Sequence, residues 1–180
     1  MAEAGRHEEA GGTTYRRLAF GVAAGVIAAD QIAKQLATRL LPQDAPVHLF
    51  GGVHVQLFRN FAGPGGHFAG HAVLISVFTV LAAIALVAFI ARSRLDRVTA
   101  IALGLFLGGA IGNGLDRLLR GPGPLRGGVV DWLAPSAHGG SMNLADLSLN
   151  AAVVVLIAGA LISMVPSKKR RRRVDPDAAA

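Results

Sequence analysis

The stretch that decides the fold is residues 108–146, GGAIGNGLDRLLRGPGPLRGGVVDWLAPSAHGGSMNLAD. It contains three of the chain's eleven acidic residues, Asp116, Asp131 and Asp146, and it joins two long apolar segments. An ionisable side chain at membrane depth costs about 3 kcal/mol or more, so it is interpreted first as functional. The stretch is therefore a candidate site at the ends of neighbouring membrane helices.

The composition predicts a multi-pass membrane protein. The chain has 180 residues, of which 52% are hydrophobic and 16% are charged, and its mean hydropathy is +0.48. This charged fraction is well below the roughly 25% of a soluble domain. Segments nearly free of charge alternate with short basic clusters, which is typical of membrane proteins. The absence of Cys excludes disulfides and thiolate chemistry.

The net charge of +7 could indicate nucleic-acid binding, but its location favours another partner. Residues 168–173 form one basic run directly after an apolar segment. Anionic lipid headgroups attract basic residues at that position. We therefore expect contact with membrane lipids and no binding of nucleic acid.

Hydropathy predicts an all-α membrane protein with four transmembrane helices, at residues 15–41, 72–91, 98–115 and 142–165. Residues 1–14 are predicted to be a disordered cytoplasmic tail, residues 15–166 the membrane domain, and residues 167–180 a basic cytoplasmic tail. Arg16 and Arg17 before an apolar run are also typical of a signal peptide. The run continues past Asp30 and Lys34 into further spans, which favours an uncleaved first helix.

Residues 47–60 predict a small extracytoplasmic β element. Val53, Val55 and Leu57 occupy every second position, and Gly51-Gly52 provides a turn. This pattern predicts a hairpin. The edge of such a hairpin could pair with an extended peptide.

The distribution of basic residues predicts the orientation. Twelve of the eighteen Lys and Arg residues lie in the N-terminal segment, the 92–97 turn and the C-terminal tail, whereas five lie in the other loops. The positive-inside rule then places both termini in the cytoplasm and residues 42–71 and 117–141 outside. The acidic cluster accordingly faces the outer side.

Three further patterns concern polar residues. Asp30 and Lys34 are spaced i, i+4 and can pair, either as structural support or as contacts with substrate. Asn143, Asp146 and Asn150 are predicted to share one inward face.

His67 and His71 have the spacing of a metal pair, but no third ligand is nearby, so two interfacial histidines are favoured.

Acid–base chemistry suits this set of residues. Two carboxylates forced close together cannot both ionise cheaply, so one keeps a proton while the other can activate water. Asp131, delivered by a loop, and Asp146, on the fourth helix, are the best pair. Asp116 and Arg117 could instead form a structural ion pair. This chemistry requires neither a metal nor a cofactor.

The motifs GNGLDR, VVDW and MNLAD, with ADQIAK upstream, resemble those of lipoprotein signal peptidase (signal peptidase II). The similarity covers most of residues 28–150. It implies an aspartyl endopeptidase of the bacterial cytoplasmic membrane, with its active site toward the outer face. Its substrates would be prolipoprotein signal peptides, cut before a diacylglyceryl-modified Cys.

By the same resemblance Asp131 and Asp146 are the catalytic pair. The residues implied to bind substrate or support the site are Asp30, Lys34, Asn60, Asn113, Asp116, Arg117 and Asn143. The chain departs from the family pattern in two places, a link lengthened by about six residues through 121–128 and an altered 60–68 segment. Both lie where substrate would enter.

The alternative function is a non-catalytic small multi-pass protein, either a degenerate relative or a transporter. A transporter typically has internal repeats, and none is found here. A degenerate relative is expected to lose one of the two carboxylates. Gly104, Gly108 and Gly112 form a stripe that indicates close helix packing within one chain, so a monomer is expected.

Overall fold

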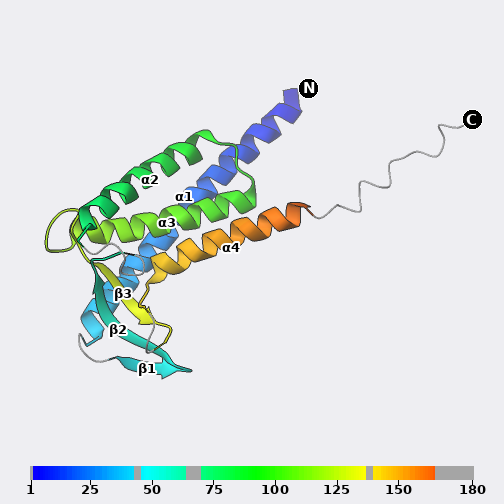
Figure 1. The fold of residues 1–180 in the computed structure, drawn as a ribbon. Helices are drawn as coiled ribbons and strands as arrows, with labels where there is room; N and C mark the ends of the chain where they lie inside the picture. Colours follow the sequence, from blue (N-terminus) through cyan, green and yellow to red (C-terminus); the bar gives the residue numbers. More distant parts are fainter. Residues whose placement is uncertain (1, 43–45, 64–69, 137–139, 165–180) are drawn as a thin grey trace, which may run out of the picture.

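The computed structural model describes residues 2–42, 46–63, 70–136 and 140–164. A bundle of four helices carries a small sheet at one end (Figure 1). In chain order the elements are α1 (Ala2–Leu40), β1 (Val47–Phe50), β2 (Val53–Asn60), α2 (Ala72–Arg92), α3 (Arg97–Leu119), β3 (Val129–Ala134) and α4 (Leu144–Met164). The start of α1 and the end of α4 both lie on the side away from the sheet. The predicted class, a mostly helical membrane protein with a small β element, is confirmed.

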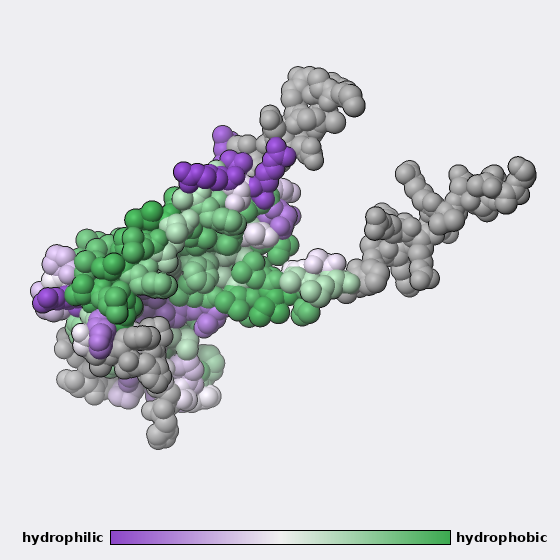
Figure 2. All heavy atoms as spheres, turned by 45° about the horizontal axis from the view of Figure 1, so that its top comes forward, coloured by the Kyte–Doolittle hydropathy of each residue, from purple (hydrophilic) through white to green (hydrophobic). Residues whose placement is uncertain are grey.

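Three of the helices in the described part of the chain, α2, α3 and α4, are long and apolar enough to cross a membrane. Figure 2 shows hydrophobic side chains covering the bundle, with hydrophilic groups gathered at its ends. The polar residues Asp30, Gln31 and Lys34 make α1 less apolar than these three. That α1 also spans the membrane stays a prediction, which its packing along α3 favours.

The N-terminal boundary differs from the prediction, because α1 begins at Ala2 and not after residue 14. Ala, Glu and Arg in this segment are good helix formers. Adding a residue to an existing helix needs no new nucleation, so the apolar part of α1 can extend backward. The predicted tail at 167–180 lies outside the described residues.

The sheet has three antiparallel strands in the order β1-β2-β3. The predicted hairpin is confirmed: Val47 pairs with Val55, and the turn glycines Gly51 and Gly52 have φ of +54° and +87°. The expectation that a loop delivers Asp131 is wrong, because Asp131 lies on β3 opposite Phe58 of β2. A strand that forms through pairing with a distant segment leaves only a weak local pattern in the sequence.

Glycines bring α3 into close contact with α1. A Cβ added to Gly104 would lie 2.5 Å from the Ala19 carbonyl oxygen, and one on Gly108 would lie 2.6 Å from Val26 Cβ. One turn further on, Gly112 leaves room for the carboxylate of Asp30. The glycine stripe therefore packs helices within the chain, as predicted.

The other helix ends are tied by polar contacts. Arg16 donates to the carbonyl oxygens of Ser93 (2.8 Å) and Ala91 (3.0 Å), which lie where α2 ends. The side chain of Asp96 accepts from the backbone N–H groups of Val98 and Thr99 and so caps α3. Arg16 thus connects α1 to the end of α2, and that the first helix stays uncleaved remains a prediction.

The inserted segment 121–128 forms neither helix nor strand, and it is attached to the helices at two points. The Ser76 hydroxyl of α2 donates to the Leu125 carbonyl (2.7 Å), and the Gly127 N–H donates to the Arg117 carbonyl (3.1 Å). Leu125 is half-buried, whereas Arg126 is exposed. Leu125 and Gly127 therefore hold this segment against α2 and α3.

We predict that Gly108→Ala destabilises the protein, because the added methyl group collides with Val26 and overpacking costs about 1–3 kcal/mol. Gly25→Ala is the matched control, since nothing lies within 4 Å of a Cβ added there. That change should leave the melting temperature unchanged or raise it, because Ala has a higher helix propensity than Gly, by up to about 1 kcal/mol in free energy of unfolding. Thermal unfolding in detergent measures both, and equal melting temperatures for the two variants would contradict the prediction.

Candidate active site

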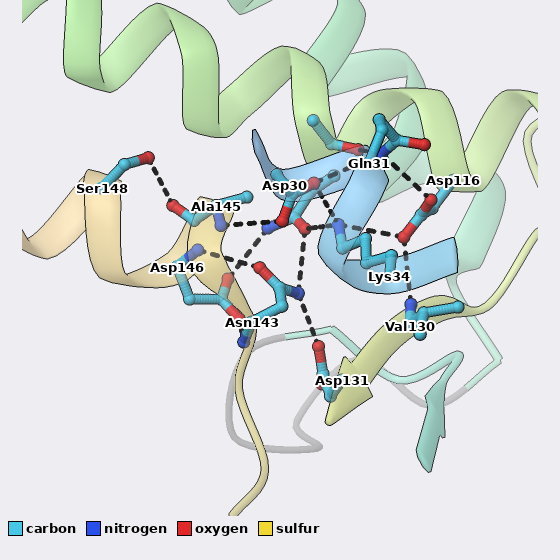
Figure 3. Close-up of polar contacts among 12 residues, drawn as sticks. Asp30, Gln31, Lys34, Asp116, Val130, Asp131, Asn143, Ala145, Asp146 and Ser148 are labelled. Carbon is cyan, nitrogen blue, oxygen red and sulfur yellow. Dashed lines mark hydrogen bonds and ion pairs between the residues drawn. The ribbon is translucent and has the colours of Figure 1, made fainter. Parts of the chain in front are cut away.

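A connected set of buried polar side chains lies where α1, α3 and α4 meet β3 (Figure 3). The exposed fractions of Asp30, Lys34 and Asn143 are 0%, and those of Asp116 and Asp131 are 1%. Buried charged groups must be paired or hydrogen-bonded, since their desolvation is expensive. The contacts made by each member therefore show how the site is held together.

Lys34 of α1 is the central cation. Its Nζ lies 2.8 Å from Asp30 Oδ2 and 3.0 Å from Asp116 Oδ2, and it donates to Asn113 Oδ1 at 2.9 Å. The other oxygen of Asp30 accepts from the backbone N–H of Ala145 on α4 (2.9 Å). The predicted Asp30–Lys34 pair is confirmed, and it joins three helices, which favours its interpretation as support for the site.

Asp116 connects α3 to the sheet. Besides Lys34, it accepts from the Val130 N–H (3.0 Å) and from Arg120 Nε (2.6 Å). The suggested Asp116–Arg117 ion pair is wrong, since neighbouring helix residues point in different directions and i, i+4 residues share a face. The ion-pair partners of Asp116 are Lys34 and Arg120.

Arg117 is nevertheless part of the cluster. Its side chain is only 4% exposed, and its charge interacts with Asp131, Asp116 and Asp146. Its Nη1 atom is buried without a hydrogen-bond partner among the described residues. Arg117 therefore contributes positive charge beside the two candidate catalytic carboxylates.

Two asparagines connect Asp131 and Asp146. Asn143 Nδ2 donates to Asp131 Oδ1 at 2.6 Å, and Asn143 Oδ1 accepts from the backbone N–H of Asp146 at 3.0 Å. Asn113 Nδ2 donates to Asp146 Oδ1 at 2.8 Å. An amide both donates and accepts, so Asn can join carboxylates in a way that Asp cannot.

The asparagines are linked to each other as well, through Asn143 Nδ2 and Asn113 Oδ1 at 3.1 Å. Each side chain thus has its orientation set by partners on both sides, which preorganises the carboxylates. Asn150, predicted to share the inward face, is exposed instead.

Asp131 is in the environment of a protonated acid. Burial, followed by the nearby charge of Asp146, raises the pKa of Asp131 to about 7 against an ordinary value of 3.8. Asn143 and Asn60 oppose this shift, since both donate to its oxygens, Asn60 at 3.2 Å. Asp131 therefore keeps its proton up to about neutral pH, as expected of a buried carboxyl near a second acid.

The sequence analysis missed two members of the cluster. Gln31 Nε2 donates to the Gly112 carbonyl (3.0 Å), to Asp30 (3.2 Å) and to Asp116 (3.3 Å). Arg120 pairs with Asp116, and its i, i+4 spacing was a signal available in the sequence. All the predicted residues except Arg117 belong to one network of hydrogen bonds and ion pairs, and Arg117 lies within electrostatic reach of it.

An apolar pocket of about 270 Å³ lies beside the cluster. It is lined by the end of α1, by Val55 of β2 and by Trp132, which follows Asp131 on β3. Within the described residues no group of three or more His, Cys, Asp and Glu side chains could hold a metal ion. His67 of the suggested metal pair lies outside those residues.

The family model described as "Signal peptidase (SPase) II" matches residues 22–162. The chain belongs to the signal peptidase II family. Among its relatives, the lipoprotein signal peptidase of Mycobacterium avium (strain 104) is 36% identical over an alignment of 145 residues that covers 74% of this chain and 79% of that protein. The lipoprotein signal peptidase of Streptomyces coelicolor is 38% identical over 167 residues, 90% of this chain and 75% of that protein. As a signal peptidase II, the chain is an aspartic peptidase of the membrane.

Two solved structures share the fold of this signal peptidase II. One, described as a bacterial membrane enzyme at 2.3 Å resolution, has a TM-score of 0.69 at 22% identity and matches 87% of this chain and 92% of its own. The other, described in the same words at 1.9 Å resolution, has a TM-score of 0.66 at 24% identity. The match covers 79% of this chain and 92% of that structure's chain. The four-helix bundle with its sheet is therefore an architecture already seen in membrane enzymes.

The raised pKa of Asp131 predicts how stability depends on pH. The folded protein holds this proton more tightly than the unfolded chain, so stability falls as pH rises from about 4 to about 7 and stays reduced above that. Asp131→Asn removes the titrating group and should therefore lose less stability than the wild type between these pH values. Thermal unfolding across the range measures the difference.

Asp96→Asn is the control, because the hydrogen bond from the Thr99 hydroxyl holds the pKa of Asp96 below its ordinary value. The stability that Asp96 contributes is already present above its ordinary pKa of 3.8, so Asp96→Asn should lose about as much stability as the wild type between pH 4 and pH 7. An equal loss in Asp131→Asn and the wild type would contradict the prediction.

Proposed function

We propose that this chain removes signal peptides from diacylglyceryl-modified prolipoproteins, with Asp131 and Asp146 as its catalytic pair. The observation that carries the assignment is the amide of Asn143, which contacts both residues. Two acids held by one amide, of which Asp131 keeps its proton up to about neutral pH, suit the acid–base chemistry of aspartyl hydrolysis. The family supplies the class of substrate.

The proposed reaction is general acid–base hydrolysis. The charged carboxylate takes a proton from water as the water oxygen attacks the scissile carbonyl carbon, while the protonated carboxyl gives its proton to the carbonyl oxygen. The tetrahedral intermediate then collapses, the C–N bond breaks, and the proton taken from water passes to the leaving nitrogen. The carbonyl oxygen returns its proton to the other carboxylate, so the pair ends as it began.

The remaining residues of the cluster have proposed supporting roles. Asn60 and Asn143 hold Asp131, and Asn113 holds Asp146. Asp30, Lys34 and Asp116 join the three helices on which these residues depend. Arg117 is proposed to face the substrate, because its Nη1 is buried without a protein partner among the described residues.

The extended substrate is proposed to lie along the sheet. Asn60 and Asp131 come from paired strands, β2 and β3, so a peptide placed there meets the catalytic pair.

The alternative of a non-catalytic relative or transporter receives no support from the site, since both carboxylates are present and hydrogen-bonded. We further propose that the enzyme acts as a monomer in contact with membrane lipids.

We predict that Asp131→Asn and Asp146→Asn each abolish cleavage of a diacylglyceryl-modified precursor, with a loss of at least about 10³-fold because the acid–base step requires both groups. The changes conserve volume, so both variants should remain folded. Ser163→Ala is a matched control, since its hydroxyl bonds only within α4. Gel-shift assays with purified protein measure cleavage, and turnover near the wild-type rate would remove that residue from the pair.

The proposed orientation places the cytoplasm on the side where α1 begins and the active site toward the outer face, in a bacterial cytoplasmic membrane. Single Cys residues introduced into this Cys-free chain can test it with a membrane-impermeant thiol reagent in whole cells. A Cys at Gly51, in the hairpin turn, should be labelled from outside, and a Cys at Arg94, between α2 and α3, should not. The reverse pattern would contradict the orientation.

A further inference from the structure

We infer that Lys34 is a positioning residue that makes Asp146 the charged member of the pair and leaves Asp131 as the proton donor. Lys34 contacts neither carboxyl of the pair directly. It acts through Asn113, whose Oδ1 accepts from Lys34 Nζ at 2.9 Å and whose Nδ2 donates to Asp146 Oδ1 at 2.8 Å. Because the inference rests on the proposed cleavage activity, its test must separate the two.

The connection to Asp131 is longer. The same Asn113 Oδ1 accepts from Asn143 Nδ2 at 3.1 Å, and that amide donates to Asp131 Oδ1 at 2.6 Å. Lys34 thus reaches Asp146 through one amide and Asp131 through two (Figure 3). A cation polarises the amide that it binds and strengthens the hydrogen bond on the amide's other side. The carboxylate one amide away receives the larger share of this stabilisation.

The backbone favours charge on the same residue. Asp146 Oδ2 accepts from the Asn143 N–H at 3.2 Å. Asp146 also lies in the first turn of α4, where the positive end of the helix dipole stabilises a negative side chain. Asp131 lies on a strand, which has little net dipole, and is 1% exposed. Charge is therefore more costly on Asp131.

Other charges surround Asp146, and each must be considered. Those on the packed elements are Lys34 and Asp30 of α1, Arg117 of α3 and Asp131 of β3. Arg117 interacts with both members of the pair, but more strongly with Asp131 than with Asp146, so it favours charge on Asp131 and opposes the effect of Lys34. Asp30 is negative and opposes a second charge on Asp146, whereas Lys34 favours it. Asp30 and Lys34 therefore act in opposite directions.

These opposite signs provide the test, which is the pH profile of kcat/KM in Lys34→Gln, Asp30→Asn and the double variant. In the wild type, protonation of Asp146 sets the acid limb and loss of the Asp131 proton sets the alkaline limb. Lys34→Gln should move the acid limb to higher pH by about one unit, at the low end of the effect of a nearby opposite charge. The alkaline limb should move less, so the active window narrows.

Asp30→Asn should move the acid limb to lower pH. The double variant should restore nearly the wild-type window, since it replaces both members of the ion pair with amides that can still hydrogen-bond. Thr38→Ala is the control, because Thr38 bonds only the backbone carbonyl of Lys34 (2.7 Å). If Lys34→Gln fails to fold, the shift of the acid limb in Asp30→Asn still tests the inference. Damage to the fold alone would lower kcat without moving the limbs in opposite directions.

Infrared spectroscopy gives a second readout that needs no substrate. At about pH 6 the wild type should show a protonated-carboxyl band that is absent in Asp131→Asn and present in Asp146→Asn. A pH window of kcat/KM that widens in Lys34→Gln would overturn the inference. So would a protonated-carboxyl band that is lost in Asp146→Asn and kept in Asp131→Asn, because the roles of the two residues would then be reversed. If the wild type fails to cut the precursor while these bands appear as expected, the proposed function fails and the assignment of the proton stands.

Discussion

The structure depends on the burial of one ammonium group among three helices. Lys34 is fully buried, and its partners come from α1 and α3, while Asp30 extends the contact to the backbone of α4. Removing one partner of a buried charge pair costs about 3–5 kcal/mol, because the remaining charge is left uncompensated. The helices must therefore meet at the depth of Lys34. The carboxylates of Asp131 and Asp146 are connected to the same contact through Asn113 and Asn143.

The glycines of α3 permit this contact. Gly104, Gly108 and Gly112 remove side chains from the face toward α1, and the last of them makes the space that Asp30 occupies. Apolar surface gives little drive for association between helices in lipid, so close packing and polar contacts must supply it. The glycine stripe and the Asp30–Lys34 pair are thus two parts of one interface. The stripe brings the backbones together, and the pair fixes their register.

Local patterns in the sequence predicted most of the fold and located the site residues. Apolar segments of about twenty residues found the three spans, and alternation with Gly51-Gly52 found the hairpin. The site motifs matched a family, and the structure gathers those residues into one cluster. Strand β3 was missed because its pairing with β2 spans seventy or so residues of chain, from Phe58 to Asp131. The pairing of Asp116 with Arg120 was missed because Arg117, the next residue in the sequence, was suggested as the partner in place of a residue one helical turn away.

The two carboxylates lie on different kinds of element, and this has a chemical consequence. If both lay on one helix, they would share its dipole and its solvent environment, and their protonation would be hard to separate. Asp146 instead lies in the first turn of α4 and is half-buried, while Asp131 lies on a strand and is almost fully buried. The difference in environment favours one proton on the strand and one charge on the helix. The strand that local sequence patterns did not reveal is therefore the element that makes the two aspartates unequal.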